Sequence, residues 1–152
     1  MVYIDSLRPL QETDLLTLEK WFENSEIASR MEGMLPLKEW YNHISKNFLQ
    51  FIQIAYTQQN PVGIIQVEKE EDIGYISLIV NPSFWNKGYG KTILCKALEQ
   101  PEFRSIRKWK ASIEEDNISS LKCFKSVGFI EEDANPDEDG FFDLVYSIPA
   151  GQ

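Results

Sequence analysis

The segment Val80–Lys91, which reads VNPSFWNKGYGK, contains the residue types best suited to binding an anion. A strand-like run ends at Asn81-Pro82, and Gly88 and Gly90 follow where the chain turns into a helical pattern. Glycines at such a turn allow backbone N–H groups to approach an anion, and the first turn of a helix adds donors without helical partners. The segment therefore predicts an anion site, with a tight strand-to-helix turn as the alternative.

The charges around this segment favour the anion site. Between Ile73 and Leu98 the sequence contains no Asp or Glu, whereas Lys87, Lys91 and Lys96 lie there. The chain of 152 residues has 24 acidic and 15 basic residues, and its formal net charge is −9. A locally positive stretch in an acidic chain favours a small polyanion over a turn with solvated lysines.

Two common nucleotide-binding loops do not fit this segment. A P-loop requires G-x-x-x-x-G-K-[S/T], and no stretch of the chain has that spacing. The dinucleotide fingerprint G-x-G-x-x-G also fails, because Ile93 stands where its third glycine would be. The sequence therefore excludes a P-loop and a Rossmann-type site at this position.

The elements that position the segment follow from hydrophobic periodicity. Leu15, Leu18 and Phe22 indicate one helix, and a second begins after Pro36 and continues through Phe48. Three strand-like runs with short connections come next, which favours antiparallel pairing. These runs are Gln50–Thr57, Val62–Lys69 and Ile73–Val80.

The second half of the chain alternates helices with strands. The expected elements are a helix over residues 90–98, a strand over 105–113, a helix over 117–127, an acidic loop over 131–139 and a last strand over 142–148. No repeat or linker interrupts this order. The sequence predicts one α/β domain with a mixed sheet over residues 1–152.

The segment Val80–Lys91 resembles the pyrophosphate signature of the GCN5-related N-acetyltransferase (GNAT) superfamily, roughly V-x-P-x-x-[Q/R]-x-x-G-x-[G/A]. Trp85 replaces the usual Gln or Arg. The run aromatic-Trp-x-Lys-Gly-Tyr-Gly is similar to a variant in acetyltransferases that modify ribosomal-protein N-termini. A second family signature, N-x-x-S-x-x-x-[Y/F]-x-x-x-G-F, is matched by Asn117, Ser120, Phe124, Gly128 and Phe129.

This resemblance implies a fold and a donor substrate. The fold would be a mixed, mostly antiparallel sheet of about seven strands flanked by about four helices. The donor would be acetyl-CoA, with its pantetheine beside a strand edge and Asn117, its thiol near Phe124, and its pyrophosphate on backbone amides. The residues expected to bind it are Leu78, Ile79, Val80, Trp85, Asn86, Lys87, Gly88, Tyr89, Gly90, Lys91, Asn117, Ser120 and Phe124.

The resemblance leaves the catalytic groups open. Many family members have a Tyr as general acid seven residues after the Asn, and Phe124 stands there. We expect Glu114, at a strand end, to act as the base, with a solvated carboxylate as the alternative. Tyr75 and Asp72 are weaker candidates, and no His/Cys spacing indicates a metal site.

The expected function is acetyl transfer from acetyl-CoA to a primary amine of a cationic small molecule or a peptide N-terminus. The alternatives are a non-catalytic acyl-CoA-binding or regulatory domain and a phosphate- or nucleotide-binding module. The net charge disfavours nucleic acid and anionic membranes as partners. Cys95 and Cys123, the two cysteines, are expected as reduced core thiols in a cytoplasmic protein, and a homodimer is possible.

Overall fold

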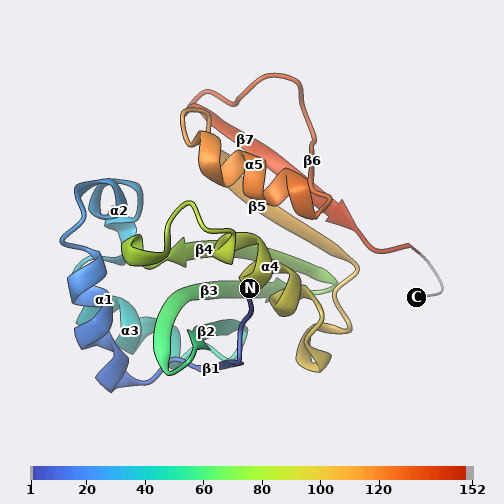
Figure 1. Ribbon diagram of the computed structural model, residues 1–152. Coiled ribbons are helices and arrows are strands. Elements are labelled where there is room, and N and C mark those ends of the chain that lie inside the picture. Colours follow the sequence, from blue (N-terminus) through green and yellow to red (C-terminus); the bar gives the residue numbers. More distant parts are fainter. Residues whose placement is uncertain (1, 150–152) are drawn as a thin grey trace.

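The central sheet has seven strands in the order β1-β2-β3-β4-β5-β7-β6 within residues 2–149, the part of the chain that the computed structural model describes (Figure 1). All neighbouring strands in this sheet pair antiparallel except β4 and β5. The predicted mixed, mostly antiparallel sheet is therefore confirmed. The strands are β1 (Ser6–Pro9), β2 (Gln50–Thr57), β3 (Asn60–Glu70), β4 (Ile73–Val80), β5 (Lys108–Glu114), β6 (Ile130–Glu131) and β7 (Phe141–Ser147).

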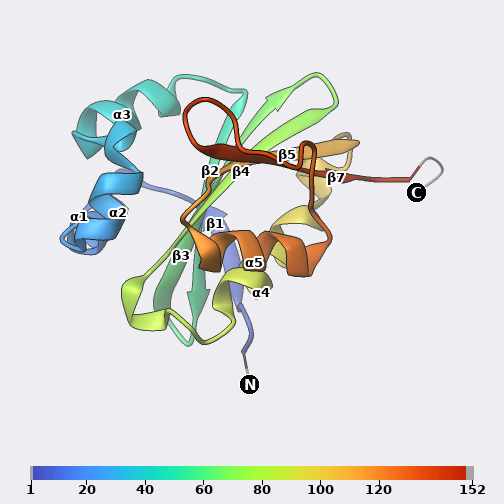
Figure 2. The same ribbon diagram turned by 90° about the horizontal axis from the view of Figure 1, so that it is seen from above.

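Helices cover both faces of the sheet, with α1, α2 and α3 on one face and α4 and α5 on the other (Figure 2). The α-helices are α1 (Leu15–Trp21), α2 (Ser25–Arg30), α3 (Leu37–Ser45), α4 (Tyr89–Leu98) and α5 (Ile118–Val127). The 3₁₀ helices are η1 (Glu12–Asp14), η2 (Glu32–Met34), η3 (Pro82–Phe84) and η4 (Pro101–Phe103). No helix within residues 2–149 is long and apolar enough to cross a membrane.

Alternation along the strands creates two hydrophobic cores. On β4, Ile79 packs under α1–α3, whereas Ile76 packs under α4 and α5. The sheet face that carries Ile79 changes from apolar to polar along the strands. Ile64 and Ile79 form one cross-strand pair, and the next pair on this face is Gln66 with Ser77. The helices α1–α3 therefore cover the apolar end of that face, and its other end is polar.

The pairing of β4 with β5 is short. It begins at Ile73 with Lys108 and ends at Tyr75 with Lys110, and these are the sheet's parallel residue pairs. Beyond Tyr75 the two strands diverge (Figure 1). Along residues 76–80, β4 thus keeps its partner β3 and has no paired strand at its other edge.

A partly buried ion pair connects the first strand to the first helices. Both Asp14 oxygens lie 2.9 Å from Arg8 guanidinium nitrogens, and Tyr56 accepts a further Arg8 hydrogen bond. Burial alone would raise the pKa of Asp14, but hydrogen bonds from Arg8 and from the Gln11 N–H outweigh it and lower the pKa. This cluster holds η1 and α1 against β1 and β2.

The structure corrects four sequence-based expectations. The helix after Pro36 ends at Ser45, so Phe48 lies beyond it and is 86% exposed. β5 begins at Lys108 instead of Ser105, because η4 and the turn after it occupy the preceding residues. β3 is longer than Val62–Lys69 at both ends, and α2 was not predicted.

Candidate functional site

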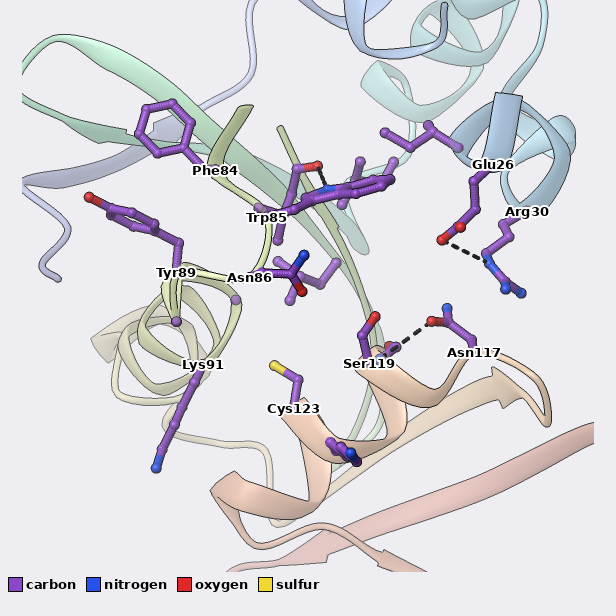
Figure 3. A pocket seen from close by; sticks show the side chains of 18 of the residues that line it. Glu26, Arg30, Phe84, Trp85, Asn86, Tyr89, Lys91, Asn117, Ser119 and Cys123 are labelled. Atoms are coloured by element: carbon purple, nitrogen blue, oxygen red, sulfur yellow. Dashed lines mark hydrogen bonds and ion pairs between the residues drawn. The ribbon is translucent and has the colours of Figure 1, made fainter. Parts of the chain in front are cut away.

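A cleft of about 420 Å³ opens where β4 ends, between α2 on one side and α4 and α5 on the other (Figure 3). Its floor includes Leu78, Ile79 and Val80, the last residues of β4 beyond its pairing with β5. The turn from η3 into α4 forms one wall, and the N-terminal half of α5 forms another. The cleft therefore lies at the divergence of β4 and β5.

The turn into α4 has the backbone geometry that the sequence predicts. Asn86 has φ of 60° and Gly88 has φ of 87°, so two left-handed residues precede the helix. Thr92 makes the first α-helical hydrogen bond, to the Gly88 carbonyl, so the N–H groups of Tyr89, Gly90 and Lys91 have no partner within the helix. These donors and the positive end of the helix dipole suit an anionic ligand.

Side-chain hydrogen bonds fix this turn to the sheet. The Trp85 indole N–H donates to the Val80 carbonyl at 2.8 Å, and the Asn81 amide donates to the Pro61 carbonyl at 2.9 Å. The Asn81 side chain also accepts from the Ser83 N–H at the start of η3. Trp85, which departs from the family signature, therefore holds the turn onto the end of β4.

Helices α4 and α5 approach closely at Gly90. A Cβ at Gly90 would lie 3.2 Å from the Cys123 sulfur, so a larger residue would push the helices apart. Cys123 lines the cleft (Figure 3), and burial raises its pKa to about 11, with Cys95 raising it further and Lys91 lowering it. Cys123 is therefore a protonated free thiol that packs against the core, as expected, and also forms part of the cleft wall.

The charged residues of the cleft are mostly basic. Its lining includes Arg30, Lys91 and Lys122 but one carboxylate, Glu26. Among residues 2–149, neither Lys91 nor Lys122 has an ion-pair partner. These two lysines leave positive charge available for a bound polyanion.

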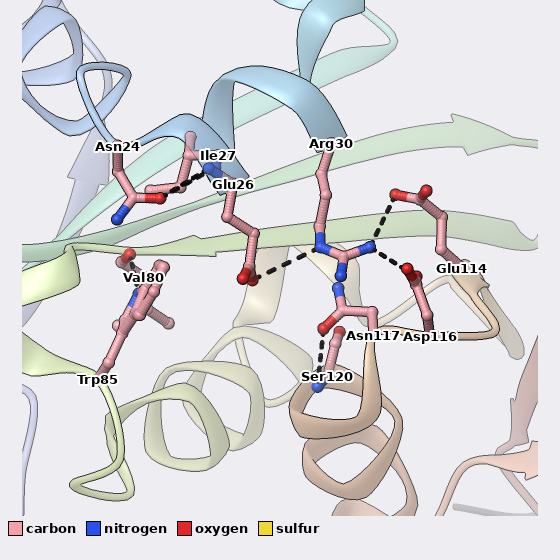
Figure 4. Close-up of polar contacts among 10 residues, drawn as sticks. All are labelled: Asn24, Glu26, Ile27, Arg30, Val80, Trp85, Glu114, Asp116, Asn117 and Ser120. Atoms are coloured by element: carbon pink, nitrogen blue, oxygen red, sulfur yellow. Dashed lines mark hydrogen bonds and ion pairs between the residues drawn. The ribbon is translucent and has the colours of Figure 1, made fainter.

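Arg30 connects α2 to the residues after β5 (Figure 4). Its guanidinium lies 3.1 Å from Glu114, 3.0 Å from Asp116 and 3.5 Å from Glu26. Burial would lower the pKa of Arg30, but the hydrogen bonds that it donates to Asp116 and Glu114 raise it. Glu114 thus lies outside the cleft lining and is held by Arg30 beside its mouth.

All but two of the residues expected to bind acetyl-CoA line the cleft. Lys87 does not, since its ammonium donates to the Ser83 carbonyl at 3.1 Å and lies 5.8 Å from the Phe84 ring centre. Phe124 does not either: it is 2% exposed and packs edge-on against Phe129 in the core. The residues that do line the cleft are Leu78, Ile79, Val80, Trp85, Asn86, Gly88, Tyr89, Gly90, Lys91, Asn117 and Ser120.

Asn117 combines its two expected roles. Its side-chain oxygen accepts from the Ser120 N–H at 3.3 Å and so caps α5, while the residue also lines the cleft. The cap uses the oxygen and leaves the amide donor for a ligand. On the same helix, Ser120 and Cys123 face the cleft, and Leu121 and Phe124 face the core.

The sequence analysis missed the wall formed by α2. Glu26, Ile27, Arg30 and Met31 line the cleft from this helix and its end. One signal was present, because the Asn24 side chain accepts hydrogen bonds from the N–H groups of Glu26 and Ile27 as an N-cap. Within residues 2–149, no three His, Cys, Asp or Glu residues are grouped so that they could hold a metal ion.

The family model described as "Acetyltransferase (GNAT) family" matches residues 15–129 of this chain. The chain belongs to the GNAT acetyltransferase family. It is 48% identical over 145 residues to the uncharacterized N-acetyltransferase YfmK of Bacillus subtilis, which covers 95% of this chain and 98% of that relative. It is 25% identical over 140 residues to a Vibrio cholerae spermidine N(1)-acetyltransferase, covering 84% and 79% of the two chains.

Solved GNAT structures share the fold of this chain. The crystal structure of spermidine N-acetyltransferase from Vibrio cholerae in complex with CoA and spermine has a TM-score of 0.78 at 19% identity, over 93% of this chain and 94% of that one. A domain from Methanocaldococcus jannaschii has a TM-score of 0.76 at 20% identity, over 94% and 97% of the two chains. The expected GNAT fold is confirmed.

The family establishes the activity and the donor. As a GNAT enzyme, this protein is an N-acetyltransferase that uses acetyl-CoA, as expected from the sequence. The alternative of a nucleotide-binding module is therefore wrong. Neither YfmK nor the spermidine acetyltransferase belongs by its name to the branch that modifies ribosomal-protein N-termini. The predicted family is therefore confirmed, and the predicted branch is not.

Gly88→Glu should abolish binding of acetyl-CoA, because it places a side chain in a left-handed turn and adds negative charge beside the α4 N-terminus. We expect the Kd from calorimetry to rise at least about tenfold, or about 1.4 kcal/mol. Gly33→Glu is the control, since a Cβ at Gly33 meets nothing within 4 Å and Gly33 lies outside the cleft lining. Unchanged binding by Gly88→Glu would contradict the turn as the anion site.

Alkylation of Cys123 by iodoacetamide should be slow at pH 7 and should accelerate about tenfold per pH unit toward its pKa of about 11, because the thiolate reacts. The rate is measured in Cys95→Ser protein, so that Cys123 alone reports. Acetyl-CoA should slow the reaction by filling the cleft. A rate that is fast at pH 7 and insensitive to acetyl-CoA would place Cys123 elsewhere.

Proposed function

We propose that this enzyme transfers an acetyl group directly from acetyl-CoA to the primary amine of a cationic acceptor, with both substrates bound together. The observation that carries the proposal is the unpaired edge of β4 beyond Tyr75, which opens the sheet beside the cleft. An edge of this kind offers backbone hydrogen bonds to an amide-containing ligand, as an added strand would. The pantetheine arm of acetyl-CoA is such a ligand.

Three features of the cleft support this mode of binding. Amides between Trp85 and Lys91 would hold the pyrophosphate at the start of α4. The backbone of residues 78–80 and the Asn117 amide would pair with the pantetheine. Lys91 and Lys122 would then face the phosphates, since both lysines line the same cleft.

The chemistry requires a neutral amine and a stabilised oxyanion. The amine nitrogen attacks the thioester carbonyl, the C–N bond forms and the C–S bond breaks. Backbone N–H groups beside Ile79 and Val80 would stabilise the oxyanion. Phe124 has no proton to donate, so CoA leaves as a thiolate or takes its proton from water.

We propose Glu114 as the group that accepts the proton of the amine. Continuing the β4–β5 register beyond Tyr75 and Lys110 would set Glu114 level with Ile79 across the opening between the strands. Arg30 holds the Glu114 carboxylate at 3.1 Å, which fixes its orientation. An aliphatic amine, like that of Lys, is protonated near neutral pH. The acceptor amine must therefore lose a proton before it attacks.

The acceptor is proposed to be a cationic small molecule. The net charge of −9 attracts cations over a distance, and one sequence relative is a spermidine N(1)-acetyltransferase. A peptide N-terminus, which the resemblance to the ribosomal-protein branch suggests, is the second acceptor class. A homodimer remains a prediction; the dodecameric state is that of the Vibrio cholerae enzyme.

Thiol release from acetyl-CoA should saturate with a polyamine and should be slower with an aminoglycoside or a peptide that has a free N-terminus. Initial rates at several concentrations of both substrates should give intersecting double-reciprocal lines, as a ternary complex requires. Gly88→Glu protein should release no thiol. Acetyl-CoA binding without thiol release from any amine would support the non-catalytic domain instead.

Glu114→Gln should lower kcat by about 10²-fold, because general bases contribute factors of this size. The KM for acetyl-CoA should stay unchanged, since Glu114 lies outside the cleft lining. Asp116→Asn is the matched control, because it removes another carboxylate from Arg30. An equal loss of kcat in both variants would assign Glu114 a structural role.

A further inference from the structure

A second cavity, of about 470 Å³, lies beside the same divergence of β4 and β5 and has no role in the binding of acetyl-CoA proposed above. We name it the outer groove. It is lined by Gln50, Gln66, Glu68, Tyr75, Ile76, Ser77, Lys110, Ala111, Ser112, Glu132 and Asp143. These residues belong to β2, β3, β4, β5 and β7 and to the loop after β6.

The outer groove and the cleft meet at adjacent residues of β4. Ser77 lines the outer groove, and Leu78, the next residue, lines the cleft. Side chains of consecutive strand residues point to opposite faces, and Leu78 lies on the α4–α5 face, where its methyl group is 3.6 Å from a Cβ placed on Gly90. The cleft thus reaches this opening from the α4–α5 face and extends past Ile79 to α2, whereas the outer groove lies on the Ser77 side of the sheet, the face that α1–α3 cover further along.

The two cavities carry opposite charge. The cleft has three basic residues and one acid, whereas the outer groove has the three acids Glu68, Glu132 and Asp143 and one base, Lys110. Lys110 lies 3.8 Å from Glu132 and offsets that carboxylate. Glu68 accepts a hydrogen bond from Gln50, and Asp143 has no ion-pair partner among residues 2–149. The groove thus offers uncompensated negative charge from Glu68 and Asp143.

The register gives the distances over which this charge acts. Asp143 pairs with Ser112, and Glu68 pairs with Tyr75, two residues from Ser77. Strand spacings put Asp143 about 5 Å from Ser112 and Glu68 about 8 Å from Ser77, measured between backbone positions. A linear diamine whose reacting nitrogen lies level with Ile79 and Glu114 would place its second nitrogen about 7 Å along the strands, level with Ser77 and Ser112 and beside these carboxylates, when about four carbons separate the two.

We propose that the outer groove binds the second ammonium group of a linear diamine or polyamine acceptor, while its first amine enters the opening toward the thioester. This proposal rests on the acetyl transfer proposed above and adds the substrate class. Glu68 and Asp143 act as specificity-determining residues that bind the distal cation. Lys110 opposes that binding, because its ammonium repels the positively charged ammonium of the acceptor.

The test compares 1,4-diaminobutane with n-butylamine, which has the same carbon chain and no second ammonium. The kcat/KM of the enzyme should be higher for the diamine. Glu68→Gln and Asp143→Asn should each raise the KM for the diamine about two- to fivefold, which is the range for partly exposed ion pairs. The KM values for butylamine and acetyl-CoA should not change.

Two further variants make the result specific. Lys110→Gln should lower the KM for the diamine, a gain that damage to the fold could not produce. Glu71→Gln, in the turn between β3 and β4 and outside the groove lining, removes the same charge and should leave every constant unchanged. Both variants use the full chain, and their thermal unfolding is compared with that of the unaltered protein.

The possible failures are distinguishable. Thiol release with both amines that is insensitive to Glu68, Asp143 and Lys110 would overturn this proposal and leave the acetyl transfer intact. Release with a peptide N-terminus but not with the diamine would overturn it as well. No release from any amine, with acetyl-CoA still bound, would overturn the proposed transfer and this proposal together.

Discussion

The limited pairing of β4 with β5 is the constraint on which the rest of the structure depends. Three residue pairs hold the strands together, and beyond Tyr75 each strand continues with a different neighbour, β3 for β4 and β7 for β5. A fully paired sheet would use the backbone groups of residues 76–80 and would close the opening. The sheet instead leaves this edge without a strand partner, which is the edge the proposed function assigns to acetyl-CoA, and the two cores under α1–α3 and α4–α5 supply the stability that the missing pairs do not.

The turn into α4 adds to this opening the backbone donors that suit a polyanion. Left-handed Asn86 and Gly88 orient the turn, and Trp85 and Asn81 fix it to β4 and β3. A preformed turn does not need to order its backbone when the ligand binds, which favours affinity. The close approach of α4 to α5 at Gly90 then sets the width of the cleft.

The sequence predicts the features that depend on local residue types. The φ of Gly88 and the strand limits of β2 and β4 follow from turn residues and alternation, and the structure agrees with them. The sequence does not predict helix α2, because the helix has six residues and buries one hydrophobic side chain, Ile27. A helical hydrophobic periodicity needs more buried positions than that. The resemblance placed Phe124 beside the thiol, although its spacing of three from Leu121 is typical of the buried face of α5. The outer groove combines residues from five strands and a loop. Which of these distant strands pair with one another cannot be derived from a single sequence.

The hydrogen bond from Trp85 to Val80 has a spectroscopic consequence. Trp85 is the tryptophan of the cleft lining, whereas Trp21 and Trp109 lie in the two cores at 4% and 0% exposure. The indole N–H of Trp109 has no hydrogen-bond partner among residues 2–149, and that of Trp85 donates to the last carbonyl of β4. The environments of these chromophores therefore differ: Trp85 reports on the cleft and Trp21 and Trp109 report on the folded interior, while the fourth tryptophan, Trp40, is half-buried beside the α1–α3 core. The protein thus contains its own optical probe of ligand occupancy, at the position where its sequence departs from the family signature.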